Sequence, residues 1–142
     1  MRMTRILAAA LAIALMAAAL EARAGELDIT IEGAKGAAPI LGQVFADSLS
    51  FTVKQGGVAK FKVDPDNGRA VAVVKDLPPG RYVVALFQDL NGNGKLDANF
   101  FGVPTEPYGF SHDVERGIGI PDFDAAAVTL GDAPLTLTIH LQ

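Results

Sequence analysis

One short segment holds the residues with the clearest chemistry, the stretch from 89 to 97 with the sequence DLNGNGKLD. Oxygen donors occupy its alternate positions, from the first to the ninth: Asp89, Asn91, Asn93, Lys95 through its backbone carbonyl, and Asp97. Gly94 stands at the sixth position, where the backbone of a calcium loop turns sharply. Because Ca²⁺ takes many oxygen ligands, it suits a tight coil that aims alternate residues at one point. The spacing therefore predicts a calcium-binding loop built from these residues.

The segment differs from a helix–loop–helix calcium hand at two points. Its twelfth position is Phe100 instead of a bidentate Glu, and the residues before Asp89 have the pattern of a strand. The loop would therefore follow a strand and need a further donor, for which later residues are available: Asn99, Glu106, Asp122 and Asp124. Mg²⁺ suits the segment less well, because it keeps several waters and few protein ligands. The alternative interpretation is an acidic Asn/Gly turn without a metal.

Other residues that could do chemistry form weaker patterns. Ser111, His112 and Asp113 are the three residue types of a catalytic triad, but sequence neighbours on an extended chain point apart. His140 falls on the polar face of the last predicted strand, where we expect a solvated side chain, and two separate His residues do not make a zinc site. We therefore expect no catalytic residues. A hydrolase that uses two carboxylates of the long loop is the less favoured alternative.

Aromatic residues gather after the predicted calcium loop. Half of the ten aromatic residues lie there: Phe100, Phe101, Tyr108, Phe110 and Phe123. We expect their rings to pack the underside of a long loop against the rest of the fold. The alternative is a carrier or sensor that binds a small apolar or sugar ligand on a platform of four rings: Phe100, Phe101, Tyr108 and Phe110.

The elements that would position these residues are short strands. Apolar and polar residues alternate along much of the chain, and the predicted strands span residues 27–31, 41–46, 59–63, 69–75, 82–88, 125–130 and 135–141. The fifth of them is apolar on both faces, which is typical of a central strand buried between layers. Turn signals separate the strands, among them Pro65-Asp66-Asn67-Gly68, which predicts a hairpin. The pattern predicts an all-β sandwich of about seven strands, with a long irregular loop between the fifth and sixth strands.

The first 24 residues have the pattern of a secretory signal. Arg2 and Arg5 precede an apolar run from residue 6 to residue 20, and Ala22-Arg23-Ala24 is a small-x-small cleavage site. The run is shorter than the roughly 20 residues that a membrane-spanning helix needs. We therefore expect a signal peptide at 1–24 and a single β-sandwich domain at 25–142. The mature protein would be exported to the periplasm or secreted, with no stable membrane span.

Composition excludes several classes of function. The chain has no Cys, so thiol catalysis, disulfides and thiolate metal sites are excluded. Without the signal peptide the basic residues fall from 12 to 9 and the acidic ones from 16 to 15, which gives a net charge of −6. Such a chain is not expected to bind nucleic acid, since it lacks a basic surface. The partners that remain are a small-molecule ligand or a protein of the cell envelope.

The stretch from 80 to 97, GRYVVALFQDLNGNGKLD, resembles the central motif of domain-of-unknown-function family 2141. Four later stretches continue the resemblance, at residues 101–104, 106, 108–111 and 121–126. The likeness extends over roughly residues 27–141. It departs from the family pattern at Gln88, where His is common, and at His112-Asp113, where Asn is expected.

The resemblance implies an exported bacterial protein with an immunoglobulin-like or prealbumin-like sandwich, and it brings no established activity. The corner Leu77-Pro78-Pro79-Gly80 before Tyr82 is also similar to that of surface-adhesin B-type repeats and carboxypeptidase regulatory-like domains. In the adhesin repeats a similar acidic Asn/Gly loop holds calcium, which is support by analogy. We therefore expect a non-enzymatic module in which calcium orders the loop from residue 100 to residue 124.

Overall fold

The computed structural model describes residues 24–117 and 119–142. Most of its regular secondary structure consists of β-strands. Strands make up 44% and helices 11% of the structure, which confirms the all-β class. In chain order the elements are β1 (Gly25–Glu32), β2 (Ile40–Phe45), α2 (Ser48–Val53), β3 (Ala59–Val63), β4 (Arg69–Leu77), β5 (Gly80–Gln88), β6 (Tyr108–Phe110), the 3₁₀ helix η1 (Ser111–Asp113), α3 (Phe123–Ala126), β7 (Val128–Leu130) and β8 (Leu135–His140).

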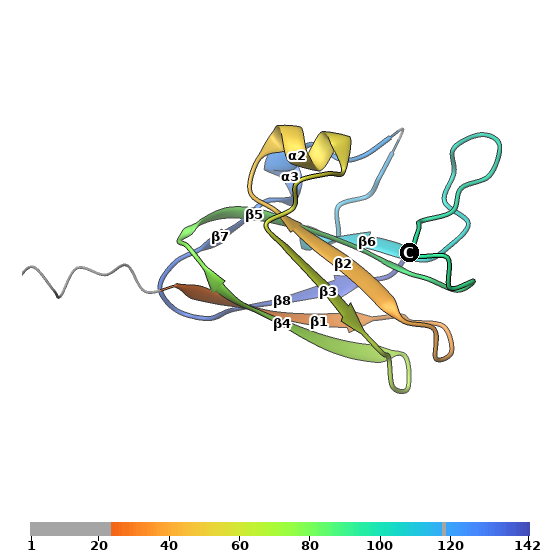
Figure 1. Cartoon of the computed structure of the whole chain (residues 1–142), viewed down its shortest axis with the longest axis horizontal. Coiled ribbons are helices and arrows are strands. Elements are labelled where there is room, and N and C mark those ends of the chain that lie inside the picture. Colours follow the sequence, from red (N-terminus) through yellow and green to blue (C-terminus); the bar gives the residue numbers. More distant parts are fainter. Residues whose placement is uncertain (1–23, 118) are drawn as a thin grey trace, which may run out of the picture.

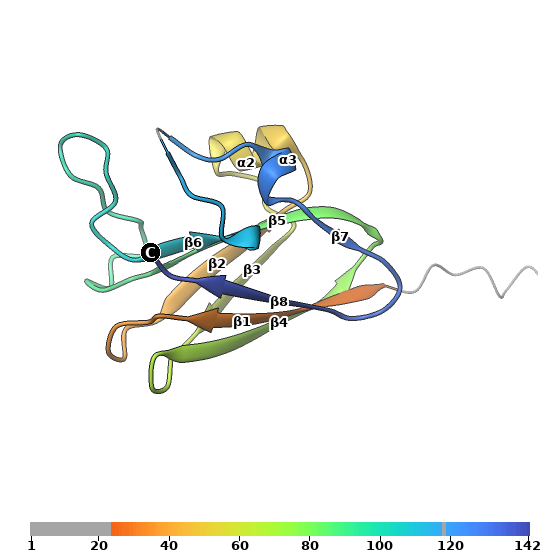
Figure 2. The ribbon, with the colours of Figure 1, turned by 180° about the vertical axis from the view of Figure 1, so that it is seen from behind.

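The strands form two sheets that face each other. The smaller sheet has the order β4-β1-β8, and the larger has the order β3-β2-β5-β6, with β7 paired to the start of β5. Strands β1 and β8 run parallel, whereas the other pairs are antiparallel. Figures 1 and 2 show α2 and α3 together on the outer side of the larger sheet, away from the smaller one. The sandwich therefore carries an additional layer on one side.

The main core lies between the sheets and follows from alternation along the strands. In β1 every second residue is buried, and Leu27, Ile29 and Ile31 are fully inaccessible to solvent. Ile29 lies opposite Ala72 of β4 and Leu137 of β8. Apolar burial of this kind stabilises a folded chain by about 25 cal/mol per Å² of apolar area removed from water. The core is therefore the main source of stability in a chain without disulfides.

The larger sheet is apolar on its outer face as well, and a second cluster of buried residues packs there. Val83 of β5 joins this cluster, while its neighbour Val84 joins the main core, which confirms that β5 is buried on both faces. Phe51 of α2 is 2% exposed and lies within 6.4 Å, centroid to centroid, of three aromatic rings, those of Phe45, Phe110 and Phe123. This cluster holds α2 and α3 on the sheet.

Helix α2 was not predicted, because six residues are too few to show a helical period. Asp47 caps it: the Oδ1 atom of Asp47 accepts a hydrogen bond of 2.8 Å from the Ser50 backbone N–H. The backbone N–H of Ser50, followed by its hydroxyl, lowers the pKa of the Asp47 carboxyl. The cap fixes the position from which Phe51 enters the second cluster.

The region between β5 and β7 is less irregular than predicted. Residues 108–110 form the strand β6, which pairs with β5 through Ala85–Phe110, Leu86–Gly109 and Phe87–Tyr108. Residues 125 and 126, predicted as part of a strand, belong to helix α3 instead, and β7 starts only at Val128. The prediction was wrong at both places, because elements of three or four residues depend on tertiary pairing and not on local periodicity.

The predicted turns form, but the strands on either side of one of them do not pair with each other as expected. Asn67 and Gly68 have the positive φ angles of a tight hairpin turn, 50° and 80°, between the bridged residues Asp66 and Arg69. The flanking strands β3 and β4 nevertheless belong to different sheets, so the predicted hairpin is a crossover. At the next corner the Tyr82 hydroxyl donates a hydrogen bond of 2.5 Å to the Pro78 carbonyl, and burial raises the pKa of Tyr82.

The predicted signal peptide lies outside the described residues, apart from Ala24. In the part of the chain that the structure describes, no helix combines the length and the apolar character that crossing a bilayer would require. The signal peptide and its cleavage therefore stay predictions.

Candidate functional site

The segment with the predicted calcium ligands starts where β5 ends, and buried hydrogen bonds fix that point. Gln88, the last residue of β5, is fully buried. Its side-chain amide donates to the carbonyls of Lys35 and Ala38, at 2.8 and 2.9 Å, and accepts from Lys35 N–H at 2.7 Å. The backbone N–H of Asp89 donates to the Pro39 carbonyl at 2.9 Å. Gln88 thus ties the start of the loop to the connection between β1 and β2.

Glu106 holds the two ends of the loop together. Its side chain is only 6% exposed, and each carboxylate oxygen accepts one backbone N–H. Oε1 accepts from Leu90 at 2.9 Å and Oε2 accepts from Asp97 at 3.0 Å. Such charge-assisted bonds are about twice as strong as neutral ones. The segment from Leu90 to Asp97 is therefore closed into a loop by one buried carboxylate.

We expect Glu106→Gln to lower the free energy of unfolding by about 1–3 kcal/mol. The NH₂ group of Gln is a donor, so it cannot accept the backbone N–H that one Glu106 oxygen now accepts, and that hydrogen bond is lost. Urea unfolding in EDTA measures this effect. The matched control is Glu115→Gln, since Glu115 is exposed. Equal stability of the two variants would contradict the role of Glu106 as a clamp.

Asp89 is the most unusual side chain of the loop. It is 4% exposed, and its Oδ2 atom accepts a hydrogen bond of 2.8 Å from the backbone N–H of Gly94. Its other oxygen, Oδ1, is buried and has no hydrogen-bond partner. Burying a carboxylate oxygen without a partner costs free energy, and most buried polar atoms in folded proteins are paired. Asp89 Oδ1 is therefore a negatively charged acceptor without a partner at the base of the loop.

Three more of the predicted ligands converge at the exposed side of the loop. The Asn91 side-chain Nδ2 lies 2.5 Å from Asp97 Oδ2, and Asn93 Nδ2 lies 2.9 Å from both Asp97 oxygens. Each Asn also accepts a backbone N–H through Oδ1, from Asn93 at 3.2 Å and from Lys95 at 2.9 Å, respectively. Gly92 and Gly94, with φ angles of 73° and 75°, allow the coil to close. The spacing in the sequence thus corresponds to a real cluster of oxygen-bearing side chains.

A family model matches this chain over residues 29–138, and its description is an uncharacterised protein conserved in bacteria, DUF2141. The match spans well over half of the sequence. The chain belongs to the DUF2141 family. No curated protein and no solved structure matches it. Family membership confirms the resemblance seen in the sequence and brings no activity with it.

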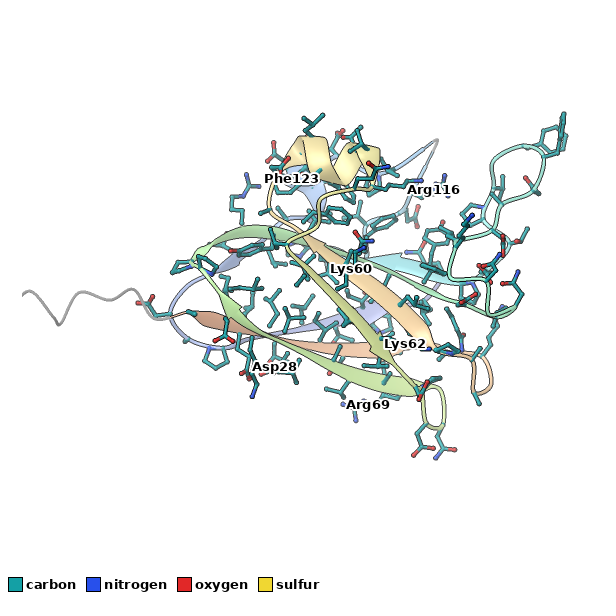
Figure 3. The ribbon with its side chains drawn as sticks, viewed as in Figure 1. Asp28, Lys60, Lys62, Arg69, Arg116 and Phe123 are labelled. Atoms are coloured by element: carbon teal, nitrogen blue, oxygen red, sulfur yellow. The ribbon has the colours of Figure 1, made fainter. Side chains whose placement is uncertain are left out.

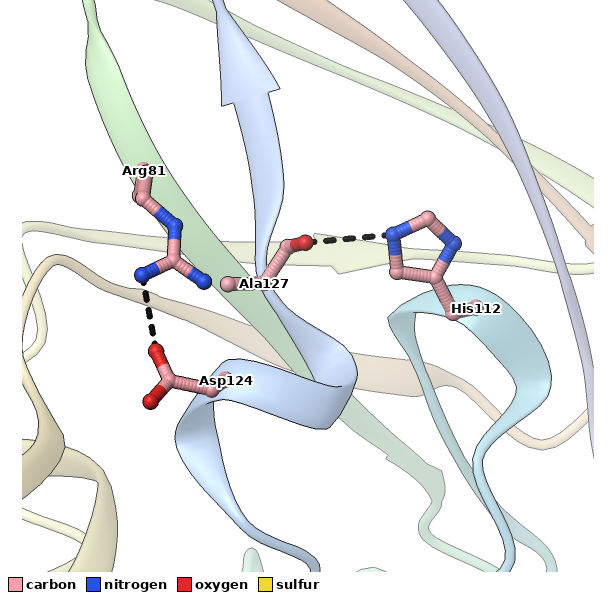
Figure 4. Close-up of polar contacts among 4 residues, drawn as sticks. All are labelled: Arg81, His112, Asp124 and Ala127. Carbon is pink, nitrogen blue, oxygen red and sulfur yellow. Dashed lines mark hydrogen bonds and ion pairs between the residues drawn. The ribbon is translucent and has the colours of Figure 1, made fainter.

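The further calcium donors predicted for the loop from Asp89 to Asp97 of this DUF2141 protein have other contacts. Asn99 Oδ1 accepts the backbone N–H groups of Phe101 and Val103, at 2.9 and 3.1 Å. Asp124 pairs with Arg81 at the start of β5, with 2.7 Å between Arg81 Nη1 and Asp124 Oδ1 (Figure 4). Asp122 precedes α3 beside it. Because a strand rises about 3.3 Å per residue, the start of β5 is roughly 26 Å from the other end of β5, where the loop begins. Asp124 therefore lies far from the predicted calcium ligands.

In the loop from Asp89 to Asp97 of this DUF2141 protein, the available oxygen donors are a few carboxylates and several neutral oxygens. In the described part of the chain no three His, Cys, Asp or Glu side chains gather in a way that would hold a metal ion. The loop itself brings two carboxylates, those of Asp89 and Asp97, together with the amides of Asn91 and Asn93. Glu106 lies next to them with both oxygens engaged by backbone N–H groups.

The aromatic residues of the long loop divide into two groups. Phe110 is 8% exposed, and its ring lies 6.0 Å from that of Tyr108, so these two rings pack on the sheet as predicted. Phe100 and Phe101 are 97% and 85% exposed at the tip of the loop, which contradicts the expected packing for them. The four rings of the alternative ligand platform are therefore divided between a loop tip and a sheet face.

Because Phe100 and Phe101 contact little besides each other, we expect the double substitution Phe100→Ser with Phe101→Ser to change the free energy of unfolding by less than about 0.5 kcal/mol. Thermal unfolding measures this. A loss of several times that size would indicate that the tip packs against the sandwich in solution.

Ser111, His112 and Asp113 do not form a catalytic triad. The Ser111 hydroxyl is fully buried, donates to the Ala126 carbonyl at 2.6 Å and accepts the Val84 N–H at 3.0 Å. The His112 ring contacts the Ala127 carbonyl (Figure 4), with 3.1 Å between Nε2 and the carbonyl oxygen. Asp113 contacts His140 instead, with Oδ2 2.6 Å from Nδ1; the His140 side chain is exposed, as predicted, and is also paired with Asp113. The three side chains serve different structural contacts.

Proposed function

We propose that this chain is an exported, non-enzymatic β-sandwich module whose loop from Asp89 to Asp97 binds Ca²⁺. The observation that carries the proposal is the unpartnered, buried Oδ1 of Asp89. The other oxygen of this carboxylate is held by Gly94, so the group is oriented within the loop before any ion arrives. A divalent cation would supply the missing partner for a carboxylate that is otherwise costly to bury.

The remaining ligands come from the side chains that already surround Asp97. The two Asn side chains now direct their NH₂ groups at the Asp97 carboxylate. Rotation about the last side-chain bond, a torsion with broad preferences, exchanges NH₂ for oxygen and would present two carbonyl oxygens instead, at the cost of the hydrogen bond that each Oδ1 now accepts from a backbone N–H. The carbonyl of Lys95 completes the proposed set. Five oxygens from a flexible coil suit Ca²⁺ better than Mg²⁺, which demands a stricter octahedral shell.

The role proposed for the ion is structural. It would order the long aromatic-rich loop and so define the surface that faces a small-molecule ligand or a protein of the cell envelope. A structural role fits the described polar side chains, since those that could act as nucleophile and base have separate contacts.

Isothermal titration calorimetry tests the proposal. The protein is first treated with EDTA, dialysed, and then titrated with CaCl₂ and, separately, with MgCl₂. We expect one Ca²⁺ per chain and weaker binding of Mg²⁺. The absence of heat with CaCl₂, together with an unchanged melting temperature, would contradict the proposal.

A further inference from the structure

A groove of about 550 Å³ lies over the outer face of the larger sheet, a size typical of ligand-binding pockets. Helix α2 and the chain after η1 cover only part of this face, and the second cluster fills the part that they cover. The uncovered part has an apolar floor, which includes Leu41 of β2, Phe87 of β5 and Tyr108 of β6, all half-buried. The outer face of a sheet in a two-layer sandwich is normally polar, so this floor calls for an occupant.

The charged residues that line the groove all have the same sign. Four basic residues take part, and no Asp or Glu does: Lys54, Lys60, Lys95 and Arg116. The chain as a whole is acidic, with 16 acidic and 12 basic residues, so this is a local reversal of charge. Within the described residues none of the four forms an ion pair. Figure 3 shows Lys60 and Arg116 on the helix-bearing side, and Asp28 and Arg69 on the opposite sheet.

We propose that the groove binds a small amphipathic anion, namely a carboxylic acid with an aliphatic chain. The chain would lie on the apolar floor, where its burial gains about 0.8 kcal/mol per methylene group. The carboxylate would lie among the basic side chains at the rim. An apolar ligand without charge would give these side chains no anionic partner, and a cation would be repelled by them. The lining therefore selects both the apolar body and the negative head.

The groove shares a wall with the candidate calcium loop, because Gly94, Lys95 and Leu96 line it. Lys95 would thus serve both sites, through its carbonyl for the ion and its side chain for the ligand. If calcium orders this wall, it should also tighten ligand binding. Only this coupling rests on the proposed function, since the floor and the other three basic residues belong to other segments.

The test is a titration of the ¹⁵N-labelled protein with three ligands of equal chain length: octanoate, octanol and octylammonium. We expect octanoate to shift the amide resonances of the groove strands β2, β5 and β6 with the lowest dissociation constant. Octanol should bind at least about tenfold more weakly, a difference of about 1.4 kcal/mol, and octylammonium should not bind. Equal affinities for the three ligands, or octanoate shifts confined to other strands, would overturn the proposal.

A pair of charge reversals on one strand provides the matched control. Lys60 and Lys62 are both exposed residues of β3, but only Lys60 lines the groove. We expect Lys60→Glu to weaken octanoate binding about tenfold, and Lys62→Glu to weaken it less than about threefold, as for a solvent-exposed charge. Equal effects of the two reversals would show that general surface charge, and not the groove, attracts the ligand.

Each titration is run in EDTA and in CaCl₂, so that failure of the two proposals can be told apart. Octanoate binding in EDTA without any calcium binding would keep the groove and remove the calcium loop. Calcium binding without octanoate binding, in either EDTA or CaCl₂, would keep the calcium loop and overturn the groove proposal. If analytical ultracentrifugation instead finds a dimer that shields the groove amides, the groove is an interface between copies, and the ligand proposal is overturned.

Discussion

In EDTA, the Asp89→Asn variant is expected to melt at or above the temperature of the unsubstituted protein, and Ca²⁺ is expected to stabilise only the latter. Asn keeps an oxygen that can accept the Gly94 N–H but removes a buried negative charge whose Oδ1 has no partner. The substitution therefore costs little without the ion. With Ca²⁺ at about 100 times its dissociation constant, the unsubstituted protein should gain about 2.7 kcal/mol. For a domain of this size that corresponds to a rise of roughly 10 °C in melting temperature.

Asp132→Asn is the control, because Asp132 is exposed and outside the loop. It removes the same charge, so any general effect of net charge on calcium association appears in both variants. We expect it to keep the full calcium-dependent rise, as measured by differential scanning calorimetry. A rise of equal size in Asp89→Asn would show that calcium binds elsewhere, and would remove Asp89 from the site.

The local patterns of the sequence predict those parts of the molecule that depend on neighbouring residues. Alternation identifies the strand around Ile29 because one face of β1 meets the core along its whole length. It cannot identify β6, whose three residues are ordered by pairing with β5, far away in the sequence. Helix α2 shows no period, but the side-chain cap from Asp47 to Ser50 is a signal that was available in the sequence.

The candidate site divides in the same way. The convergence of Asn91, Asn93 and Asp97 follows from their spacing within one coil, so the sequence predicts it. The clamp by Glu106 joins backbone groups that lie 9 and 16 residues away, and no spacing rule leads to it. The groove is still harder to predict from the sequence, because its basic residues come from four separate segments that only folding brings to one face.

Phe51→Ala is expected to lower the free energy of unfolding by about 3–5 kcal/mol, the usual cost of removing a buried aromatic ring. Phe51 is the largest fully buried side chain, and its ring contacts those of Phe45, Phe110 and Phe123. The substitution would leave a cavity between α2 and the larger sheet. Urea unfolding monitored by circular dichroism measures the loss, or shows a chain that no longer folds.

Leu49→Ala provides the comparison within the same helix, since Leu49 is 73% exposed and should cost less than about 0.5 kcal/mol. A large difference between the two variants means that the outer cluster contributes to global stability as a core does. A loss below about 1 kcal/mol for Phe51→Ala would instead mean that α2 detaches while the two sheets stay folded. In that case the covered part of the outer sheet face would be open in solution, and the groove would extend beneath the helix.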